Sequence, residues 1–476
     1  MEGLSRSVAA EDDERPVPAE TADWALNADD RPPIGGATRC ESSWRQRSAY
    51  VPRPGSDADD GTSACRASVI RPGGRCDTEA VDIDEDALRD DLAALVGFGA
   101  VGGSEAEVAI QHWCAERLTS LGLEVDHWRV DLDEARSQPD YPGEEVAREE
   151  MWGCVAATNS DRPALILAGH VDVVPTGDLA LWDSDPFTLT SRDGQWRGRG
   201  TCDMLGGVAA IFAAARAVDH ASLRRPFAIH TVVAEEDGGL GTFETLRRGH
   251  DGDACLIAEP TAGRLVTANA GSLTFRLELR GAATHGSMRR SGVSTIELLP
   301  RVLTALESLE EKRNADVATL FGPLPFPISI GIVNAGDWAS TVPDRLVAEG
   351  RYGVRPDEDF AAAEALFEAH LAELCEADPW LREHPIEVTW SGGRFAAGVT
   401  EPDHPFVQQV QSLTGAPVSG APYGSDLRLY ASAGIPTVQY GPGDITGAHA
   451  VDESVPIDEV LRCAATYRDL ILAHCT

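Results

Sequence analysis

The segment ALILAGHVDVV, residues 164–174, is an apolar run whose only strongly polar residues are His170 and Asp172. Such near-continuous apolar strands are typical of sheets that helices cover on both faces. Downstream, the strand-like segments FAIHTVVAEE (227–236) and ACLIAEP (254–260) follow the helical segment GGVAAIFAAARAV (206–218). We therefore predict an α/β fold with a mixed sheet flanked by helices.

Two amphipathic helices are predicted upstream of this segment. Residues 84–98 have the apolar spacing of a helix, and residues 104–122 follow with Ser104 and Glu107 placed as a capping box. Residues 1–80 have no sustained hydrophobic period and are rich in Pro, Gly, Asp, Ser and Arg. We predict that this opening is a disordered N-terminal extension.

The pattern of the sequence changes between residues 271 and 390. Strands and two long helices follow one another there in the order β-α-β-β-α-β, which is typical of an open-faced, ferredoxin-like sandwich with helices on one side. The chain then resumes its α/β character. We predict an extension (1–80), a main α/β domain in two parts (81–270 and 391–476) and a domain inserted between them (271–390).

The composition argues against several classes of partner. The chain has 77 acidic and 40 basic residues and a formal net charge of −37, so it would repel nucleic acid and anionic membranes. No segment approaches the roughly 18 consecutive apolar residues of a membrane helix, and acids stand where a signal peptide needs an apolar core. The ten cysteines form no CxxC pair, which favours reduced thiols. We expect a soluble, cytoplasmic protein.

Side chains that bind metals recur at the ends of the apolar strands. His170 and Asp172 face the same side of an extended segment, so the Asp172 carboxylate can accept a hydrogen bond from the imidazole. Taken singly, each such residue has an ordinary interpretation, such as a structural histidine, a helix-capping aspartate or a solvated glutamate. Together they lie at strand ends or glycine-rich loops of one sheet, where active sites gather in α/β folds. The candidates are His170, Asp203, Glu235, Glu236, Glu259 and His449.

The chemistry of this set suits two divalent metal ions. Imidazole and carboxylate groups both bind zinc well, and a carboxylate can bridge two ions. Two metals would hold a water between them, lower its pKa and stabilise the oxyanion that forms on attack. Zinc is the metal that we expect, with cobalt and manganese as alternatives.

Six short motifs carry a family resemblance: GHVDVVP, GRGTCDMLGG, EEDGG, EPT, THGSM and GAHAVDE. In this order they resemble the motifs of the dinuclear zinc peptidases and deacylases that include acetylornithine deacetylase, succinyl-diaminopimelate desuccinylase, aminoacylase and carboxypeptidase G. The resemblance extends from about residue 85 to residue 476. It implies a catalytic α/β domain that is interrupted by a lid and dimerisation domain.

The resemblance also implies a role for each candidate residue. Asp203 would bridge the two metals, Asp172 would orient a ligand, and Glu235 would be the general base that moves a proton from the water to the leaving amine. Cys202, next to Asp203, is expected to pack rather than to bind metal. The implied metal ligands are His170, Asp203, Glu236, Glu259 and His449.

Substrate-binding residues are implied in two places. In the inserted domain, His285 would reach the active site of a neighbouring subunit and help to polarise the scissile carbonyl. Asn334 and Arg355 would bind the carboxylate end of the substrate. In the late loop APYGSDLRLY, Gly424 and Ser425 would line the pocket. The alternatives are a surface histidine, a turn asparagine, a solvated arginine and a Gly-Ser turn.

Two positions depart from the family pattern. Leu205 stands where lysine is common and Arg289 where proline is usual, which weakens assignment to one subfamily. We predict a metal-dependent amidohydrolase that removes an acetyl, succinyl or formyl group from an amino acid or a related small amine. We expect it to act as a homodimer without nucleic-acid or membrane partners. The alternatives are a dipeptidase or carboxypeptidase with the same site, and a metal-binding protein without catalysis.

Overall fold

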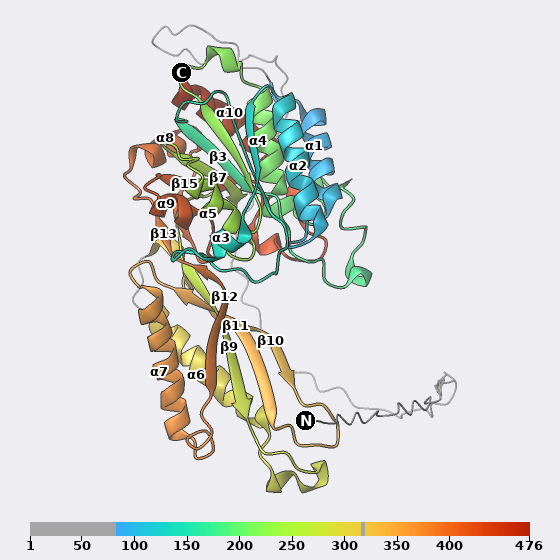
Figure 1. Cartoon of the computed structure of the whole chain (residues 1–476), viewed down its shortest axis with the longest axis vertical. Coiled ribbons are helices and arrows are strands. Elements are labelled where there is room, and N and C mark those ends of the chain that lie inside the picture. The colour runs from blue at the N-terminus through green and yellow to red at the C-terminus, as the bar shows by residue number, and fades with distance from the viewer. Residues whose placement is uncertain (1–81, 316–318) are drawn as a thin grey trace, which may run out of the picture. The chain divides into compact units, whose positions relative to one another are not determined.

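A computed structural model describes residues 82–315 and 319–476 of the chain (Figure 1). The predicted N-terminal extension, residues 1–80, lies outside the described residues. The described residues belong to one compact unit. None of the helices in the described ranges is long and apolar enough to cross a membrane.

The main sheet has nine strands and contains both parallel and antiparallel pairs. Its strands are β1 (Glu124–Arg129), β2 (Trp152–Ala157), β3 (Leu165–His170), β6 (Phe227–Val232), β7 (Cys255–Pro260), β8 (Leu265–Asn269), β13 (Gly398–Val399), β14 (Val418–Ala421) and β15 (Thr437–Gly441). Their order is β1-β2-β6-β3-β7-β15-β8-β13, with β14 paired to β8. β6, β3, β7 and β15 run parallel, whereas β1, β2 and β13 pair antiparallel with their neighbours. The predicted mixed sheet is confirmed.

Helices cover both faces of this sheet, as the apolar strands predict. They are α1 (Glu85–Phe98), α2 (Glu105–Ser120), α3 (Leu132–Arg136), α4 (Gly206–Arg216), α5 (Leu240–Arg247), α8 (Pro405–Thr414), α9 (Leu427–Ser432) and α10 (Ile457–Cys475). α1, α2 and α4 lie together in Figure 1, and α10 packs on α4. Adjacent residues of β6 face opposite sides, because the Thr231 hydroxyl contacts Gln111 of α2 and the His230 imidazole contacts the Tyr430 hydroxyl of α9.

The start of α2 differs from the sequence prediction. The helix begins after Ser104, but the Ser104 side chain makes no capping hydrogen bond. The Glu107 carboxylate accepts hydrogen bonds from the Gly103 amide (3.0 Å) and from the Arg148 guanidinium (2.9 Å). The predicted capping box is wrong because an ion pair with a distant arginine engages the glutamate.

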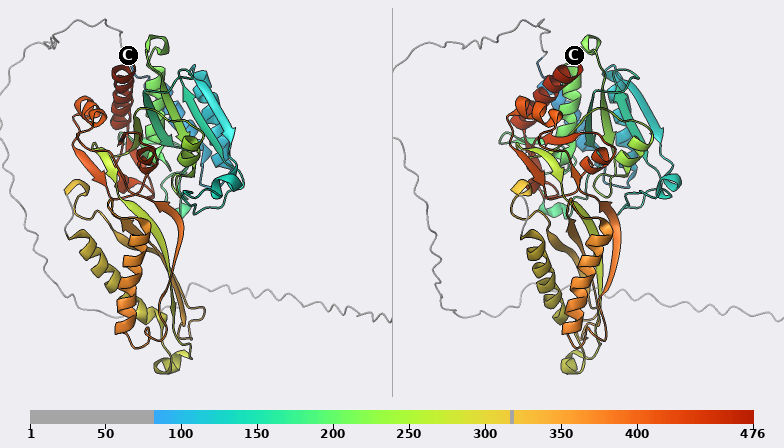
Figure 2. Two further views of the ribbon diagram at one scale, coloured as in Figure 1. Left: turned by 60° about the vertical axis from the view of Figure 1, so that its left-hand side comes forward. Right: turned by 90° about the vertical axis from the view of Figure 1, so that its left-hand side faces the viewer.

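The residues between β8 and β13 form a second sheet, here called the inserted sheet, with a core of its own. Its elements are β9 (Gly271–Arg280), α6 (Thr295–Asn314), β10 (Ile328–Ala335), β11 (Arg345–Val354), α7 (Phe360–Ala377) and β12 (Glu387–Phe395). The strands pair antiparallel in the order β10-β11-β9-β12. α6 and α7 lie side by side on one face (Figures 1 and 2), where they bury Phe275, Tyr352 and Phe367. This is the β-α-β-β-α-β order read from the sequence; its role as a lid and dimer interface stays a prediction.

Candidate metal centre

Three of the predicted metal ligands stand at one edge of the main sheet. His170 is the last residue of β3, Glu259 is the penultimate residue of β7, and Glu236 follows β6. These strands are parallel neighbours, so their carboxyl ends meet. Asp203 reaches the same edge from the glycine-rich turn before α4. His449 reaches it from the loop before a small third sheet of β4 (Thr190–Arg192), β5 (Gln195–Arg197) and β16 (Ser454–Pro456).

Asp203 lies between the two histidines. Its Oδ1 is 3.0 Å from His170 Nε2, and its Oδ2 is 3.6 Å from His449 Nε2. On one side, His170 Nε2 lies 4.0 Å from Glu259 Oε1. On the other side, His449 Nε2 lies 3.1 Å from Glu236 Oε2. The five residues predicted as ligands therefore form two groups, His170 with Glu259 and His449 with Glu236. Asp203 lies between these groups and contacts both histidines.

Asp172 contacts its neighbours differently from the prediction. Its Oδ1 is 3.6 Å from His170 Nδ1, beyond hydrogen-bond distance, whereas its backbone carbonyl oxygen is 3.0 Å away and accepts that bond. The carboxylate instead accepts hydrogen bonds from the backbone amides of Glu235 (3.4 Å) and Glu236 (3.3 Å). Asp172 thus orients the histidine through its backbone and holds the glutamate turn through its side chain.

The donor set fits a divalent metal ion. Ligand atoms of His170, Asp203 and Glu236, and those of His170, Glu235 and Glu259, lie within 4.8 Å of one another. Because Nδ1 of His170 donates to a carbonyl, Nε2 presents its lone pair to the Asp203 carboxylate. A contact of 3.0 Å between this nitrogen and a carboxylate oxygen is satisfied by a proton on Nε2 or by a metal cation that both groups bind.

Burial and like charges perturb the pKa values of this cluster. Burial raises the pKa of Glu235, and the charge of Glu259 adds to the shift. Burial also raises the pKa of Glu259, and it raises the pKa of Asp172 to about 7. The hydrogen bond with Glu236 raises the pKa of His449 to about 9. Crowded acids of this kind are stabilised in their charged form by a bound cation.

Glu453 holds the turn that presents Asp203. Its buried carboxylate accepts hydrogen bonds from the amides of Gly200 (2.9 Å), Cys202 (2.9 Å) and Asp203 (3.0 Å), and from the Arg199 guanidinium (2.8 Å). Cys202 itself is buried. The sequence analysis missed the role of Glu453, although the residue stands in the motif GAHAVDE, where an acid so close to a ligand was the available signal.

A second buried group fixes the turn that follows β6. The Arg148 side chain is fully buried and donates to the carboxylates of Glu107 (2.9 Å) and Asp237 (2.8 Å). Asp237 directly follows Glu236 and also accepts a hydrogen bond from the Glu145 amide (3.1 Å). Asp237 stands in the motif EEDGG, but nothing in the sequence links it to Glu107 or Arg148, which are far away in the chain.

A cavity of about 520 Å³ opens over the metal ligands. The main domain supplies one wall and the inserted sheet supplies the other, so a small molecule can contact both. From the main domain the lining includes Glu145, Asp203, Glu235, Glu236, Glu259, Tyr423, Gly424 and His449. From the inserted sheet it includes Ser272, Thr274, Ser329, Glu349, Arg351 and Phe395.

The structure brings one of the predicted substrate-binding residues to this cavity. Gly424 lines it. Ser425 is buried, and its hydroxyl accepts a hydrogen bond from Gln439 (2.7 Å). Arg355 pairs with Asp357 (3.0 Å) and lies outside the lining. Ser425 and Arg355 therefore have partners of their own away from the cavity.

His285 and Asn334 are exposed, and neither lines the cavity of its own chain. Arg351 lines it instead, although the sequence analysis did not single out this residue. The sequence could have indicated it through the alternation of side chains along β11. Leu346 and Tyr352 lie in the core, so Arg351, at an odd-numbered position, points to the opposite face of the strand.

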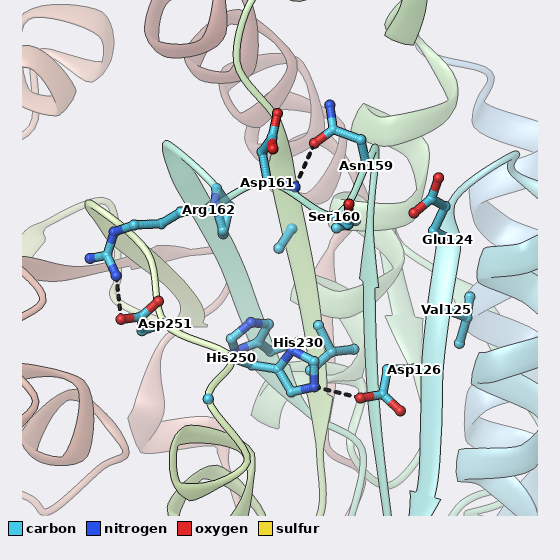
Figure 3. Close-up of a pocket in the computed structure, with 15 residues that line it drawn as sticks. Glu124, Val125, Asp126, Asn159, Ser160, Asp161, Arg162, His230, His250 and Asp251 are labelled. Atoms are coloured by element: carbon cyan, nitrogen blue, oxygen red, sulfur yellow. Dashed lines mark hydrogen bonds and ion pairs between the residues drawn. The ribbon is translucent and has the colours of Figure 1, made fainter.

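A second hollow, of about 510 Å³, lies over strands β1, β2 and β6 (Figure 3). Asp126 there pairs with His250 (2.9 Å), and Asp251 pairs with Arg162, as Figure 3 shows. The imidazole Nε2 of His230 is buried without a partner. Among the described residues, each group of three or more potential metal ligands contains His170 and two carboxylates that line the first cavity.

The sequence profile of peptidase family M20/M25/M40 matches residues 166–473. The chain belongs to this family. The matched range contains all five candidate ligands and the inserted sheet. The family resemblance carried by the six sequence motifs is confirmed.

Curated relatives support the same placement in peptidase family M20/M25/M40. The N-formyl-4-amino-5-aminomethyl-2-methylpyrimidine deformylase of Bacillus subtilis strain 168 is 28% identical over 394 residues, which cover 77% of this chain and 89% of the relative. The acetylornithine deacetylase of Proteus mirabilis strain HI4320 is 29% identical over 316 residues, which cover 64% and 78%.

Solved structures show the same fold. An M20 family metallo-carboxypeptidase from Sulfolobus solfataricus has a TM-score of 0.62 at 15% identity and covers 81% of this chain and 98% of its own. A dipeptidase from Saccharomyces cerevisiae has a TM-score of 0.63 at 16% identity, with coverage of 81% and 95%. At these identities the similarity concerns the fold alone.

Proposed function

We propose that the protein is a metal-dependent amidohydrolase that removes an N-acyl group from an amino acid or a related small amine. The observation that carries this proposal is the cluster of two histidines and four carboxylates that meet at the cavity over the main sheet. Membership of the M20/M25/M40 family supports hydrolysis of an amide bond. The relatives named as a deformylase and a deacetylase support removal of an acyl group.

Two divalent ions fit the donor set in this proposal, with zinc as the expected metal and cobalt or manganese as alternatives. His170 and Glu259 would hold one ion, and Glu236 and His449 would hold the other. Asp203 would be shared, since its two carboxylate oxygens face different histidines. When bound, the ions would lower the pKa of a water and stabilise negative charge on the substrate oxygen.

Glu235 is proposed as the group that moves the proton. Its side chain is buried, lines the cavity and has a carboxylate oxygen within 4.8 Å of ligand atoms of His170 and Glu259. Burial raises its pKa, so the carboxylate can accept a proton from the attacking water and give it to the leaving nitrogen. Glu235 and Glu236 thereby have different tasks, proton transfer and metal binding.

A hydrolysis screen tests this function. N-acetyl, N-formyl and N-succinyl amino acids are compared with dipeptides, with added Zn²⁺ and with a chelator. We expect turnover of acyl amino acids with Zn²⁺ and none with the chelator. Cleavage of dipeptides alone would favour the alternative of a dipeptidase or carboxypeptidase. Full activity in chelator would contradict the metal-dependent mechanism, and metal binding without any hydrolysis would favour a non-catalytic protein.

We also propose that the protein forms a homodimer through β10. This strand, ISIGIVNA, is an uncharged edge of the inserted sheet, and its Ile332 and Val333 are 52% and 45% exposed. Exposed apolar edges pair readily with another strand. The exposed His285 would then be available to the partner subunit's cavity. Ile332→Lys should shift the mass measured by light scattering to that of a monomer; an unchanged dimer would exclude this interface.

A cytoplasmic location is part of the same proposal. The seven cysteines within the described residues are free and buried. Unpaired thiols are the rule in reducing compartments, where disulfides do not persist. A small N-acyl amine remains the proposed substrate, with no nucleic-acid or membrane partner.

A further inference from the structure

The second hollow, over β1, β2 and β6, has a floor that consists of two rows of paired residues (Figure 3). The first row is Asp126, Val155 and His230, and the second row is Glu124, Ala157 and Ala228. Residues that are paired across antiparallel strands point to the same face of a sheet. The second row contributes only methyl groups beside its glutamate, which leaves room for a small molecule above the sheet.

Two loops form the walls of this hollow. Residues 159–163 connect β2 with β3, and residues 249–251 follow α5, which ends at Arg247. Arg162 of the first loop pairs with Asp251 of the second, as Figure 3 shows. The described residues that line the hollow belong to strands and loops and to no helix. This part of the sheet face is therefore open.

His230 brings an unsatisfied polar atom to the floor. The residue is 1% exposed, its Nδ1 lies 2.9 Å from the Tyr430 hydroxyl oxygen, and its Nε2 has no hydrogen-bond partner. Burial lowers the pKa of His230 to about 3, so the imidazole is neutral near pH 7. When Nδ1 holds the proton, Nε2 is a hydrogen-bond acceptor. A buried acceptor without a donor is unfavourable, and a ligand with an N–H group would satisfy it.

The charged side chains around the hollow are mainly acids. The acids are Glu124, Asp126, Asp161 and Asp251, and the basic side chains are Arg162 and His250. Asp126 pairs with His250 (2.9 Å), whereas Glu124 and Asp161 form no ion pair with a described residue. A cavity lined mainly by acids attracts cations and repels anions.

We propose that this hollow binds a small organic amine in its protonated form. An N–H group of the amine would donate to His230 Nε2, and its carbon chain would lie over the methyl groups of the second row. The unpaired carboxylates of Glu124 and Asp161 would attract its charge. An apolar floor with a few placed polar groups is typical of sites for small molecules. The site is separate from the metal centre, and the inference does not depend on the proposed hydrolysis.

The test compares three probes of similar size and different charge: butylamine, butanol and butyrate. Their binding to the full-length protein with added Zn²⁺ is measured by isothermal titration calorimetry at pH 7. We expect butylamine to bind at least about tenfold more tightly than the other two, because butanol has no charge and the acids repel butyrate. Equal binding of butylamine and butanol would overturn the inference.

Two variants of the floor test where the amine binds. His230→Phe should weaken the binding of butylamine by about 10- to 100-fold, because a hydrogen bond to a charged ligand is lost. Ala157→Leu places a larger side chain in the hollow from a half-buried position and should abolish binding while His230 is intact. This second variant tests the site even if His230→Phe does not fold.

A matched pair of double variants tests the role of charge. Glu124→Gln with Asp161→Asn should weaken the binding of butylamine by about 3- to 10-fold. Glu401→Gln with Asp403→Asn removes the same charge at two exposed acids outside the hollow and should change the affinity by less than about twofold. Equal weakening by both pairs would indicate attraction to the acidic surface as a whole. Unchanged affinity in Ala157→Leu would indicate binding elsewhere, such as at the metal centre, and either result overturns the inference.

Discussion

Replacing Arg148 with methionine would leave two buried carboxylates without their cation. The Arg148 side chain is fully buried, and it donates to Glu107 and Asp237, whose side chains are 1% and 7% exposed. Removing one partner of a buried ion pair costs about 3–5 kcal/mol, because the remaining charge is uncompensated. Methionine fills much of the volume of the arginine stem, so we expect the loss to reflect charge rather than a cavity. We predict a loss of about that size in the free energy of unfolding.

The assay is urea denaturation followed by circular dichroism, with metal removed so that binding does not add to stability. Arg192→Met is the control, because Arg192 is 64% exposed and its pair with Asp183 (3.5 Å) should contribute less than about 1 kcal/mol. The triple variant Glu107→Gln, Arg148→Met, Asp237→Asn should recover part of the loss. A single Arg148→Met variant within about 1 kcal/mol of the wild type would refute this account of the network.

Three further changes at the site and in its surroundings should have measurable effects. Glu453→Gln should weaken zinc binding by about 10- to 100-fold in a chelator competition, because the turn of Asp203 loses an acceptor that orients it; unchanged affinity would contradict this role. Zinc at about 1,000 times its Kd should add about 4 kcal/mol to the free energy of unfolding and raise the melting temperature, whereas an unchanged melting curve would argue against a folded metal site. Burial lowers the pKa of His230 to about 3. As pH falls below about 6.5, the unfolded chain therefore binds a proton that the folded chain does not, and the free energy of unfolding decreases toward pH 3. His230→Phe should make that decrease shallower by about 1.4 kcal/mol per pH unit, and an identical slope would show that His230 is not the group responsible.

The local sequence pattern was sufficient to predict most helices and strands and to select the candidate metal ligands. The helices predicted at residues 84–98 and 104–122 correspond to α1 (Glu85–Phe98) and α2 (Glu105–Ser120), and the predicted β-α-β-β-α-β order is that of the inserted sheet. His170, Glu236 and Glu259 could be grouped from the sequence, because the ends of parallel strands share one edge of a sheet. The positions of these three residues at strand ends were therefore sufficient to predict that they lie close together.

The features that sequence reasoning missed depend on distant partners. Glu107 looked like a capping residue, but Arg148, 41 positions away, engages its carboxylate. Arg355 looked like the substrate-binding arginine, yet the structure pairs it with Asp357 and brings Arg351 to the cavity. The partners of these side chains depend on tertiary packing, which cannot be read from a single sequence.

The proposed role of Glu235 in proton transfer is tested most directly by two measurements on the same protein. The zinc content per chain is measured by inductively coupled plasma emission. The rate of hydrolysis of the best acyl amino acid is measured on the same preparations of wild type and Glu235→Gln. Glu244→Gln is a control at a buried glutamate outside the cavity, which pairs with Arg247.

We predict two zinc ions per chain in all three proteins, and turnover that is about 10²- to 10⁴-fold slower in Glu235→Gln alone. Wild-type turnover by Glu235→Gln would contradict its role in proton transfer. Loss of zinc from that variant would instead make Glu235 a metal ligand and contradict the division of tasks between the two adjacent glutamates.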